Sequence, residues 1–128
     1  ARIQNALKNI RRLNDKRTGA RSGSMPDGAG WENPKDIGKL TNCHHSWPHI
    51  DSTHYACLSI AHGNVDRGLY TVQKVYKNLH VKANLMYKQP FCWDVETEAP
   101  CATDPQFRHM GALSIWHVYY ALLGFFLD

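Results

Sequence analysis

No two of the four cysteines in this sequence have the CxxC spacing, which excludes zinc-ribbon and thioredoxin-type motifs. The sequence also lacks the GxSxG turn of serine hydrolases, the GxxxxGK loop that binds phosphate groups and the HExxH pair of zinc peptidases. It has no NxS/T site either, so N-glycosylation is not expected. Because no catalytic motif is recognised, we expect that the protein is not an enzyme and uses no cofactor or metal.

Charged side chains are absent from residues 110–127, which read MGALSIWHVYYALLGFFL. A helix of this length would be about 27 Å long, close to the roughly 30 Å hydrocarbon core of a bilayer. The segment could be the central core helix of a small bundle, or it could insert into a membrane when the protein acts. Its Gly, Ser, His and Tyr residues favour the core helix, because a membrane anchor is usually richer in Leu, Ile and Val.

Basic residues are concentrated at one end of the chain. The formal net charge is +4, but residues 1–22 carry seven basic side chains against the single acid Asp15, and the rest of the chain has a net charge of −2. The basic character therefore belongs to the N-terminal segment, and the body of the protein shows no sign of a nucleic-acid surface. We expect no nucleic-acid partner.

Apolar residues at helical spacing predict a basic amphipathic helix over residues 2–15, with Ile3, Leu7, Ile10 and Leu13 on one face. Residues 16–50 are rich in Gly, Pro, Ser, Asp and Asn and are predicted to form a loop-rich connection. Asp51 is a candidate N-cap and Gly63 a candidate helix end, which predicts a helix over residues 52–62.

The strongest periodic pattern follows and predicts a long helix over residues 64–87, whose apolar positions are Val65, Leu69, Val72, Tyr76, Leu79, Ala83 and Met86. Residues 79–87 also alternate as a strand would, so a strand remains an alternative there. Pro90 ends the element in either case. A loop over residues 88–103 and a terminal helix that begins at Asp104-Pro105 complete the pattern.

These elements predict an all-α fold with one domain over residues 1–128. Residues 1–17 would be a basic helical arm that processing could remove, residues 18–50 a loop-rich connection and residues 51–128 the helical core. The four cysteines suggest two disulfides, for which the spacing favours Cys43–Cys57 and Cys92–Cys101, although three connectivities exist. Two disulfides would suit an oxidising compartment, and we therefore expect a secreted protein.

Histidine is the most suggestive residue type for chemistry, because His44, His45, His49, His54 and His62 lie close together in the sequence. The only pair at helical spacing, His45 and His49, is separated by Pro48, so we expect solvated loop histidines and no metal site. His62 and Asp66 could form a base and its carboxylate partner, but Gly63 lies between them. His117 is expected to be a buried histidine.

The spacing of the cysteines resembles that of small secreted phospholipases of bacteria and fungi. In that family a Cys-x-x-His-Asp motif begins a helix, whereas this chain reads Cys57-Leu58-Ser59-Ile60-Ala61. Isoleucine and alanine thus replace the catalytic histidine and the calcium-binding aspartate. The resemblance implies a helical, disulfide-linked scaffold without the phospholipase chemistry.

The chain also resembles the virally encoded killer toxins of fungi, especially those of smut fungi. The dibasic pairs Arg11-Arg12 and Lys16-Arg17 directly precede a segment rich in Gly, Ser and Pro, as at sites cut by Kex-type proteases. The likeness also includes the expected disulfides, the lack of an active-site motif and the apolar C-terminal segment. It implies a secreted toxin released from a precursor.

We therefore predict a secreted cytotoxic or antifungal protein that acts at the membrane or a surface receptor of a target cell. The residues expected to contact the target are Arg2, Lys8, Arg11, Arg12, Trp116, Tyr119, Tyr120, Phe125 and Phe126. The solution form would hide the apolar segment between the other helices, and self-association through the C-terminal helix is a further expectation. A lipid hydrolase-like protein and a carrier of a small apolar ligand are the alternatives.

Overall fold

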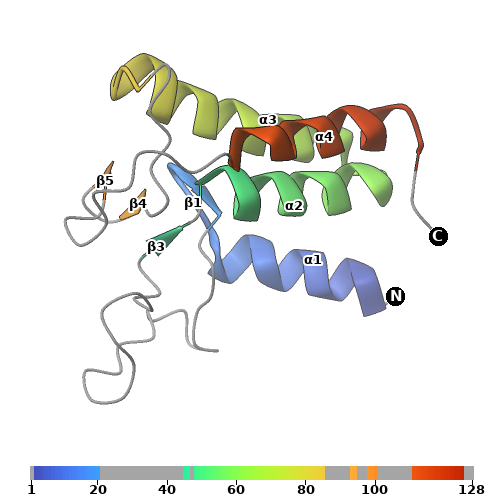
Figure 1. Cartoon of the computed structure of the whole chain (residues 1–128). Coiled ribbons are helices and arrows are strands. Elements are labelled where there is room, and N and C mark those ends of the chain that lie inside the picture. The colour runs from blue at the N-terminus through green and yellow to red at the C-terminus, as the bar shows by residue number, and fades with distance from the viewer. Residues whose placement is uncertain are drawn as a thin grey trace, which may run out of the picture.

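Helices dominate the computed structural model, which describes residues 2–20, 45–46, 48–85, 93–94, 98–100 and 111–125 (Figure 1). The α-helices are α1 (Arg2–Leu13), α2 (Pro48–Ala61), α3 (Val65–Tyr76) and α4 (Ile115–Leu122). The π-helix η1 (Lys77–Lys82) continues α3, and the short 3-10 helix η2 (Gly111–Ser114) precedes α4. The predicted helical fold is thereby confirmed at the level of the helices, and the first helix ends within two residues of its expected boundary.

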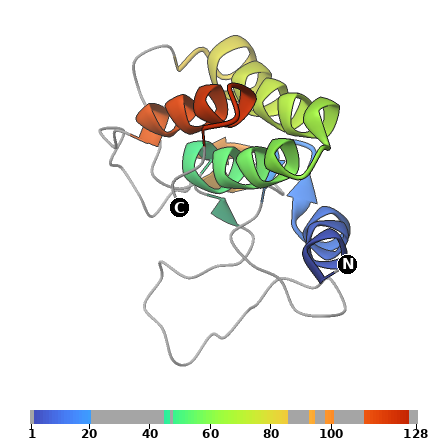
Figure 2. The same ribbon diagram turned by 90° about the vertical axis from the view of Figure 1, so that its right-hand side faces the viewer.

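Helix α2 lies at the centre of this arrangement, with α1 on one side and both α3 and α4 on the other (Figures 1 and 2). Its buried side chains are mostly small or hydroxylated: Ser52, Thr53, Tyr55, Ala56, Ser59 and Ile60. Small side chains let three helices approach closely, and the hydroxyls find partners, since Ser59 Oγ donates to the Tyr55 carbonyl at 2.8 Å. The central helix is therefore α2, and the expectation that the apolar C-terminal segment is the core rod is wrong.

The boundaries of α2 differ in part from the predicted ones. The helix begins at Pro48, three residues before the expected N-cap Asp51, because proline is well suited to the first turn of a helix. The C-terminal boundary is confirmed. Gly63 has a positive φ of 84°, its N–H donates to the carbonyl of Ile60, and the next N–H, that of Asn64, donates to Ser59.

Helix α3 was predicted correctly as a helix, but its buried face is displaced from the predicted one. Val65, Leu69 and Tyr76, which were expected to face the core, are exposed. The buried positions are Gly68, Thr71 and Val75 in α3 and Asn78 and Leu79 in η1. The reason is the close approach of α2: a Cβ on Gly68 would lie 2.6 Å from Ile60 Cγ1 and 2.7 Å from the carbonyl oxygen of Ala56.

The end of this long helix packs around a tryptophan. Trp93 is almost fully buried against Val75 and Leu79, with Ala83 and Leu85 at the edge of the cluster. Residues 79–82 are helical, so the alternative of a strand is wrong there, and the helix ends before the predicted residue 87. Met86 and the proposed helix start at Asp104-Pro105 lie outside the described residues.

Two small antiparallel sheets were not predicted. Strands β1 (Asp15–Lys16) and β2 (Gly19–Ala20) form a hairpin directly after α1, in register Asp15 with Ala20. Strands β3 (His45–Ser46), β4 (Trp93–Asp94) and β5 (Ala99–Pro100) form the second sheet in that order. The hairpin begins at Asp15, the last residue of the predicted first helix, and otherwise lies in the segment that was predicted to be a loop. It is held to α2 by Ser52 Oγ, which accepts the N–H of Ala20 at 2.9 Å.

The expected disulfide Cys43–Cys57 is not formed, because Cys57 is a free, half-buried thiol that packs against the cluster around Ala56. Each of the three connectivities would pair Cys57, so this correction applies to all of them. Cys43, Cys92 and Cys101 lie outside the described residues. Burial raises the pKa of the Cys57 thiol, which disfavours the reactive thiolate.

Candidate functional site

The terminal helix α4 is shorter than the apolar segment that contains it. It ends at Leu122, and Gly124 turns the chain with a positive φ of 74°. Its eight residues span about 12 Å. Among the residues that the structure describes, no helix combines the length and the apolar character needed to cross a membrane. The expected continuous helix over residues 110–127 is therefore wrong at its C-terminal end.

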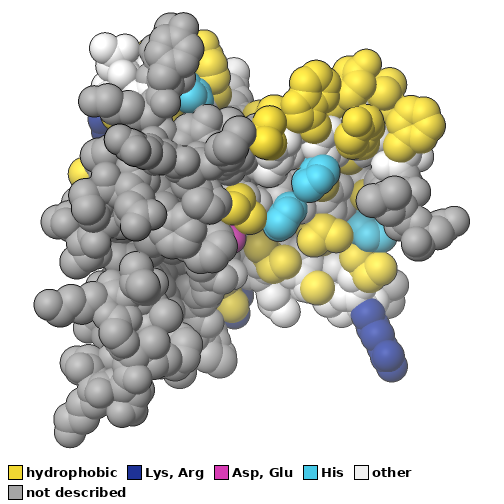
Figure 3. Space-filling model, viewed as in Figure 1, with side chains coloured by type: hydrophobic (Ala, Val, Ile, Leu, Met, Phe, Trp, Pro, Cys, Tyr) yellow, Lys and Arg dark blue, Asp and Glu magenta, His cyan; other side chains and the backbone are white. Residues whose placement is uncertain are grey.

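Only a narrow stripe of α4 is buried. Val118 and Ala121 pack against Ala56 and Ile60 of α2. The large apolar side chains on the rest of this segment are exposed: Leu113, Ile115, Trp116, Tyr119, Tyr120, Leu122, Leu123 and Phe125. We call these eight residues the α4 face. Figure 3 shows hydrophobic side chains gathered over the position of α4. The prediction that the solution form hides this segment is contradicted.

Aromatic rings form a row on the α4 face. The ring centroids of Trp116 and Tyr119 are 6.1 Å apart with an edge-on angle of 86°, and those of Tyr119 and Tyr120 are 6.2 Å apart. Such edge-to-face contacts hold the rings in place while leaving each about half exposed. Of the predicted aromatic contact residues, Phe125 is also exposed, and Phe126 lies outside the described residues.

Two polar contacts hold α4 and η2 on the central helix. The hydroxyls of Thr53 and Ser114 are 2.7 Å apart and form a hydrogen bond. The imidazole rings of His54 and His117 stack with centroids 6.0 Å apart and an interplanar angle of 22°. Both histidines are exposed, so the expectation that His117 is buried is wrong. The Thr53–Ser114 hydrogen bond and the packing of Val118 and Ala121 orient the α4 face toward solvent.

The predicted basic contact residues lie on a different side of the molecule. Arg2, Lys8, Arg11 and Arg12 are exposed on α1, which packs through Leu7 against Ala20 and Tyr55. Helix α2 separates α1 from α4 in both views (Figures 1 and 2). A flat surface in contact with the α4 face therefore does not touch the basic side of α1 at the same time.

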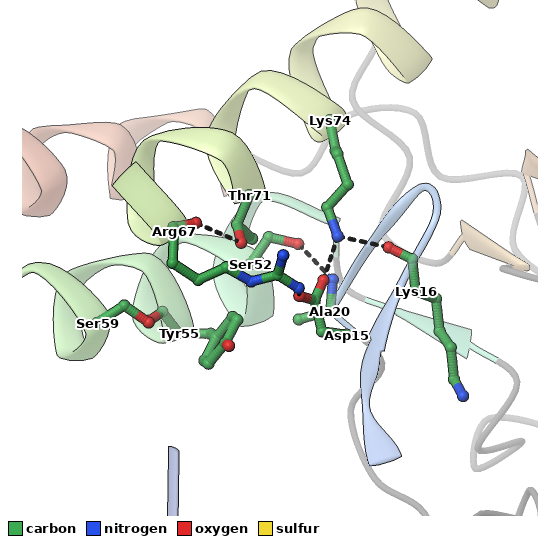
Figure 4. A network of polar contacts seen from close by, with 9 residues as sticks. All are labelled: Asp15, Lys16, Ala20, Ser52, Tyr55, Ser59, Arg67, Thr71 and Lys74. Carbon is green, nitrogen blue, oxygen red and sulfur yellow. Dashed lines mark hydrogen bonds and ion pairs between the residues drawn. The ribbon is translucent and has the colours of Figure 1, made fainter. Parts of the chain in front are cut away.

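A buried ion cluster connects the hairpin with α3 (Figure 4). The Asp15 side chain is fully buried and forms ion pairs with Arg67 and Lys74. Lys74 Nζ also donates a hydrogen bond of 2.6 Å to the carbonyl of Lys16. Both cations lie 5.4 Å from the ring centroid of Tyr70, which lies between them on α3. The cluster has one negative charge for two positive charges. Asp15 is therefore the residue whose loss would leave both cations of the cluster without this ion pair.

Sequence reasoning did not assign these residues a role, although two signals were present. Asp15 is the single acid among the basic residues of the N-terminal segment. Arg67, Tyr70, Thr71 and Lys74 follow the i, i+3, i+4, i+7 spacing of one helix face. Removing residues 1–17 would also remove Asp15 and leave two largely buried cations unpaired. The expectation that these residues form a removable arm conflicts with this packing.

The pH dependence of stability should show the burial of Lys74. Burial, with the charge of Arg67, lowers the pKa of Lys74 from 10.5 to about 8. Between these values the unfolded chain binds the proton and the folded chain does not, so this group adds stability as pH rises. We expect the stability difference between wild type and Lys74→Met to increase from pH 7 to pH 9.5, measured by urea unfolding, in favour of wild type.

This comparison removes the opposite contributions of Tyr55 and Cys57, whose pKa values burial raises in both proteins. Lys77→Met is the control, because Lys77 is exposed on the next turn. A wild-type advantage over Lys74→Met that stays constant or shrinks with pH would show that Lys74 keeps its proton in the folded chain.

The residues considered for catalysis lie at the end of α2 and the start of α3. Asp66 is exposed at the start of α3, and the carbonyl of His62 accepts a hydrogen bond of 3.1 Å from Gln4 Nε2. Ile60, at the position of the phospholipase histidine, is buried in the core. The described residues contain no group of three or more His, Cys, Asp or Glu side chains that could hold a metal ion.

Comparison of the chain with protein-family models, with curated proteins and with solved structures found no match. The ion cluster has a structural role, because it stabilises the packing of the hairpin on α3. The exposed α4 face has no such role in the fold, and it is therefore the candidate functional site.

Proposed function

We propose that this protein acts at the surface of a target cell and that the α4 face is the part that binds the membrane. The observation that carries the proposal is the exposure of eight large apolar side chains on one short segment without charged residues. Extended apolar patches of this kind mark binding surfaces, because leaving them in water is unfavourable. In a membrane-active killer-type toxin such a surface would be the effector surface.

The composition of the α4 face favours a lipid interface as its partner. Trp116, Tyr119 and Tyr120 have apolar rings with a polar group, the combination that is enriched where hydrocarbon meets headgroups. A helix of this length would lie in the plane of the interface, with its backbone hydrogen bonds satisfied internally. Each half-exposed side chain that enters the lipid contributes about 1 kcal/mol, so several together reach micromolar affinity before the entropy cost of association.

The basic residues of α1 have a separate part in this proposal. Because α2 lies between α1 and α4, Arg2, Lys8, Arg11 and Arg12 attract the protein toward a negatively charged surface from a distance. Contact is then made by the α4 face. The proposed activity is that of a secreted cytotoxic protein without catalysis, and it needs no cofactor.

Binding to vesicles tests the proposal. Purified protein would be sedimented with phosphatidylcholine vesicles that contain or lack phosphatidylserine, and release of a trapped dye would be followed in parallel. We expect the protein to sediment with the vesicles at high lipid concentration, because the entropy cost of association weakens the apolar contact. Dye release would support direct membrane damage, while binding without release would support a surface-acting protein. Absence of binding, or burial of the α4 face in a stable dimer that does not bind, would overturn the proposal.

A further inference from the structure

His54 and His117 lie where the α4 face meets the central helix. They come from different elements, α2 and α4, yet their rings stack at 6.0 Å and both side chains are exposed. Figure 3 shows two neighbouring histidine side chains below the hydrophobic area. Histidine is the side chain that gains a positive charge between neutral and mildly acidic pH. Two positive charges would then appear together at the border of an otherwise uncharged surface.

Among the described residues, few charged groups lie on the elements that carry this pair. On α2 the ionisable neighbours of His54 are Asp51, one turn earlier, and Cys57, one turn later. Residues 111–122 of η2 and α4 contain no Asp, Glu, Lys or Arg, and the ionisable neighbours of His117 there are the phenols Tyr119 and Tyr120. Helix α3 directs Arg67 and Lys74 toward the hairpin (Figure 4), and α1 packs on the other side of α2. Asp51 is the one acidic residue of α2.

We propose that His54 and His117 form a pH-dependent cationic contact beside the α4 face, so that the partner of this surface is a membrane rich in anionic lipid at acidic pH. This inference rests on the proposed function and adds two details to it: the lipid is anionic, and binding is strongest at acidic pH. Near an anionic bilayer each cation strengthens binding about fivefold, so the pair contributes roughly 25-fold. At neutral pH only the apolar contact of the α4 face remains. The protein then binds more weakly, and the α4 face does not distinguish anionic from neutral lipid.

The test is sedimentation with vesicles of phosphatidylcholine containing about 30% phosphatidylserine, compared with phosphatidylcholine alone, at about pH 5 and about pH 7.5. We expect wild type to bind the anionic vesicles roughly 25-fold more strongly at the lower pH, with little change on neutral vesicles. His54→Gln with His117→Gln should bind as wild type does at neutral pH and lose most of the rise. His80→Gln, on η1, should keep the rise.

A variant with a permanent charge separates this effect from a change in folding. His54→Lys with His117→Gln should bind anionic vesicles about fivefold more strongly than the double glutamine variant at neutral pH, without a further rise in acid. Two results would overturn the inference and leave the proposed function intact. One is an equal increase of binding in acid for wild type and the double glutamine variant, and the other is binding of wild type that does not change with pH. Absence of binding at either pH would overturn both.

Discussion

Replacing Asp15 with Asn is expected to lower the free energy of unfolding by about 3–5 kcal/mol, because the substitution removes the one negative partner that the described residues provide for two largely buried cations. Arg67 and Lys74 are held at this place by the α3 backbone and cannot both turn out to solvent without breaking the contact with the hairpin. Small domains have about 5–15 kcal/mol of stability in total, so this loss would make the fold marginal. Urea unfolding followed by circular dichroism measures it.

The control for Asp15 is Glu98, which also pairs with two cations. Its partners Arg17 and Lys82 have 81% and 62% of their side-chain surface exposed, and Glu98→Gln should therefore cost less than about 1 kcal/mol. Adding Lys74→Met to Asp15→Asn should recover part of the loss, since it removes one of the unpaired charges. A cost for Asp15→Asn as small as that for Glu98→Gln would show that the cluster is not buried in solution.

Removing the aromatic row is expected to weaken vesicle binding by about 100-fold, since three half-exposed rings contribute roughly 1 kcal/mol each. The change is Trp116→Ala with Tyr119→Ala and Tyr120→Ala. These rings contact one another and are each about half exposed, so the free energy of unfolding should change much less than it would for a core substitution. Binding would be measured by sedimentation with phosphatidylcholine–phosphatidylserine vesicles, and folding by circular dichroism.

The matched control replaces three exposed apolar side chains elsewhere, Ile3, Tyr76 and Val81, with alanine. It removes comparable apolar surface from α1, α3 and η1 and should leave binding unchanged. If both triple variants lost binding to the same extent, the interaction would be a general property of the exposed apolar surface. The assignment of the membrane contact to the α4 face would then be wrong.

The sequence pattern was sufficient to locate the helices, but it did not show which helix lies at the centre or which face of each helix is buried. Periodicity located α1 and α3, and glycine chemistry located the end of α2 at Gly63. The buried face of α3 could not be predicted, because it depends on the close approach of Gly68 to Ile60 and Ala56, a contact between elements. The hydrophobicity of Leu69 and Tyr76 suggested the core, but the packing distance between helices left them outside.

The same limit explains the error at the C-terminus. Hydrophobicity suggested that residues 110–127 were the core of the bundle, but the centre was already occupied by α2, whose serine, threonine and alanine side chains give no strong apolar signal. Trp116, Tyr119 and Tyr120 were named as contact residues, but the sequence reasoning placed them in a segment hidden in solution, whereas the structure exposes all three. The stacking of His54 on His117 joins residues 63 positions apart, and no local pattern indicates it.

Hydroxyl-radical footprinting of the tyrosine and tryptophan side chains, with and without anionic vesicles, tests the central proposal most directly. In the free protein Tyr119 and Tyr120 are 53% and 49% exposed, and Tyr70 and Tyr76, on α3, are 51% and 58% exposed, so the two pairs should react at similar rates. If the α4 face binds the membrane, vesicles should protect Trp116, Tyr119 and Tyr120 and leave Tyr70 and Tyr76 reactive. Protection of the α3 pair with no protection of the α4 residues would contradict it.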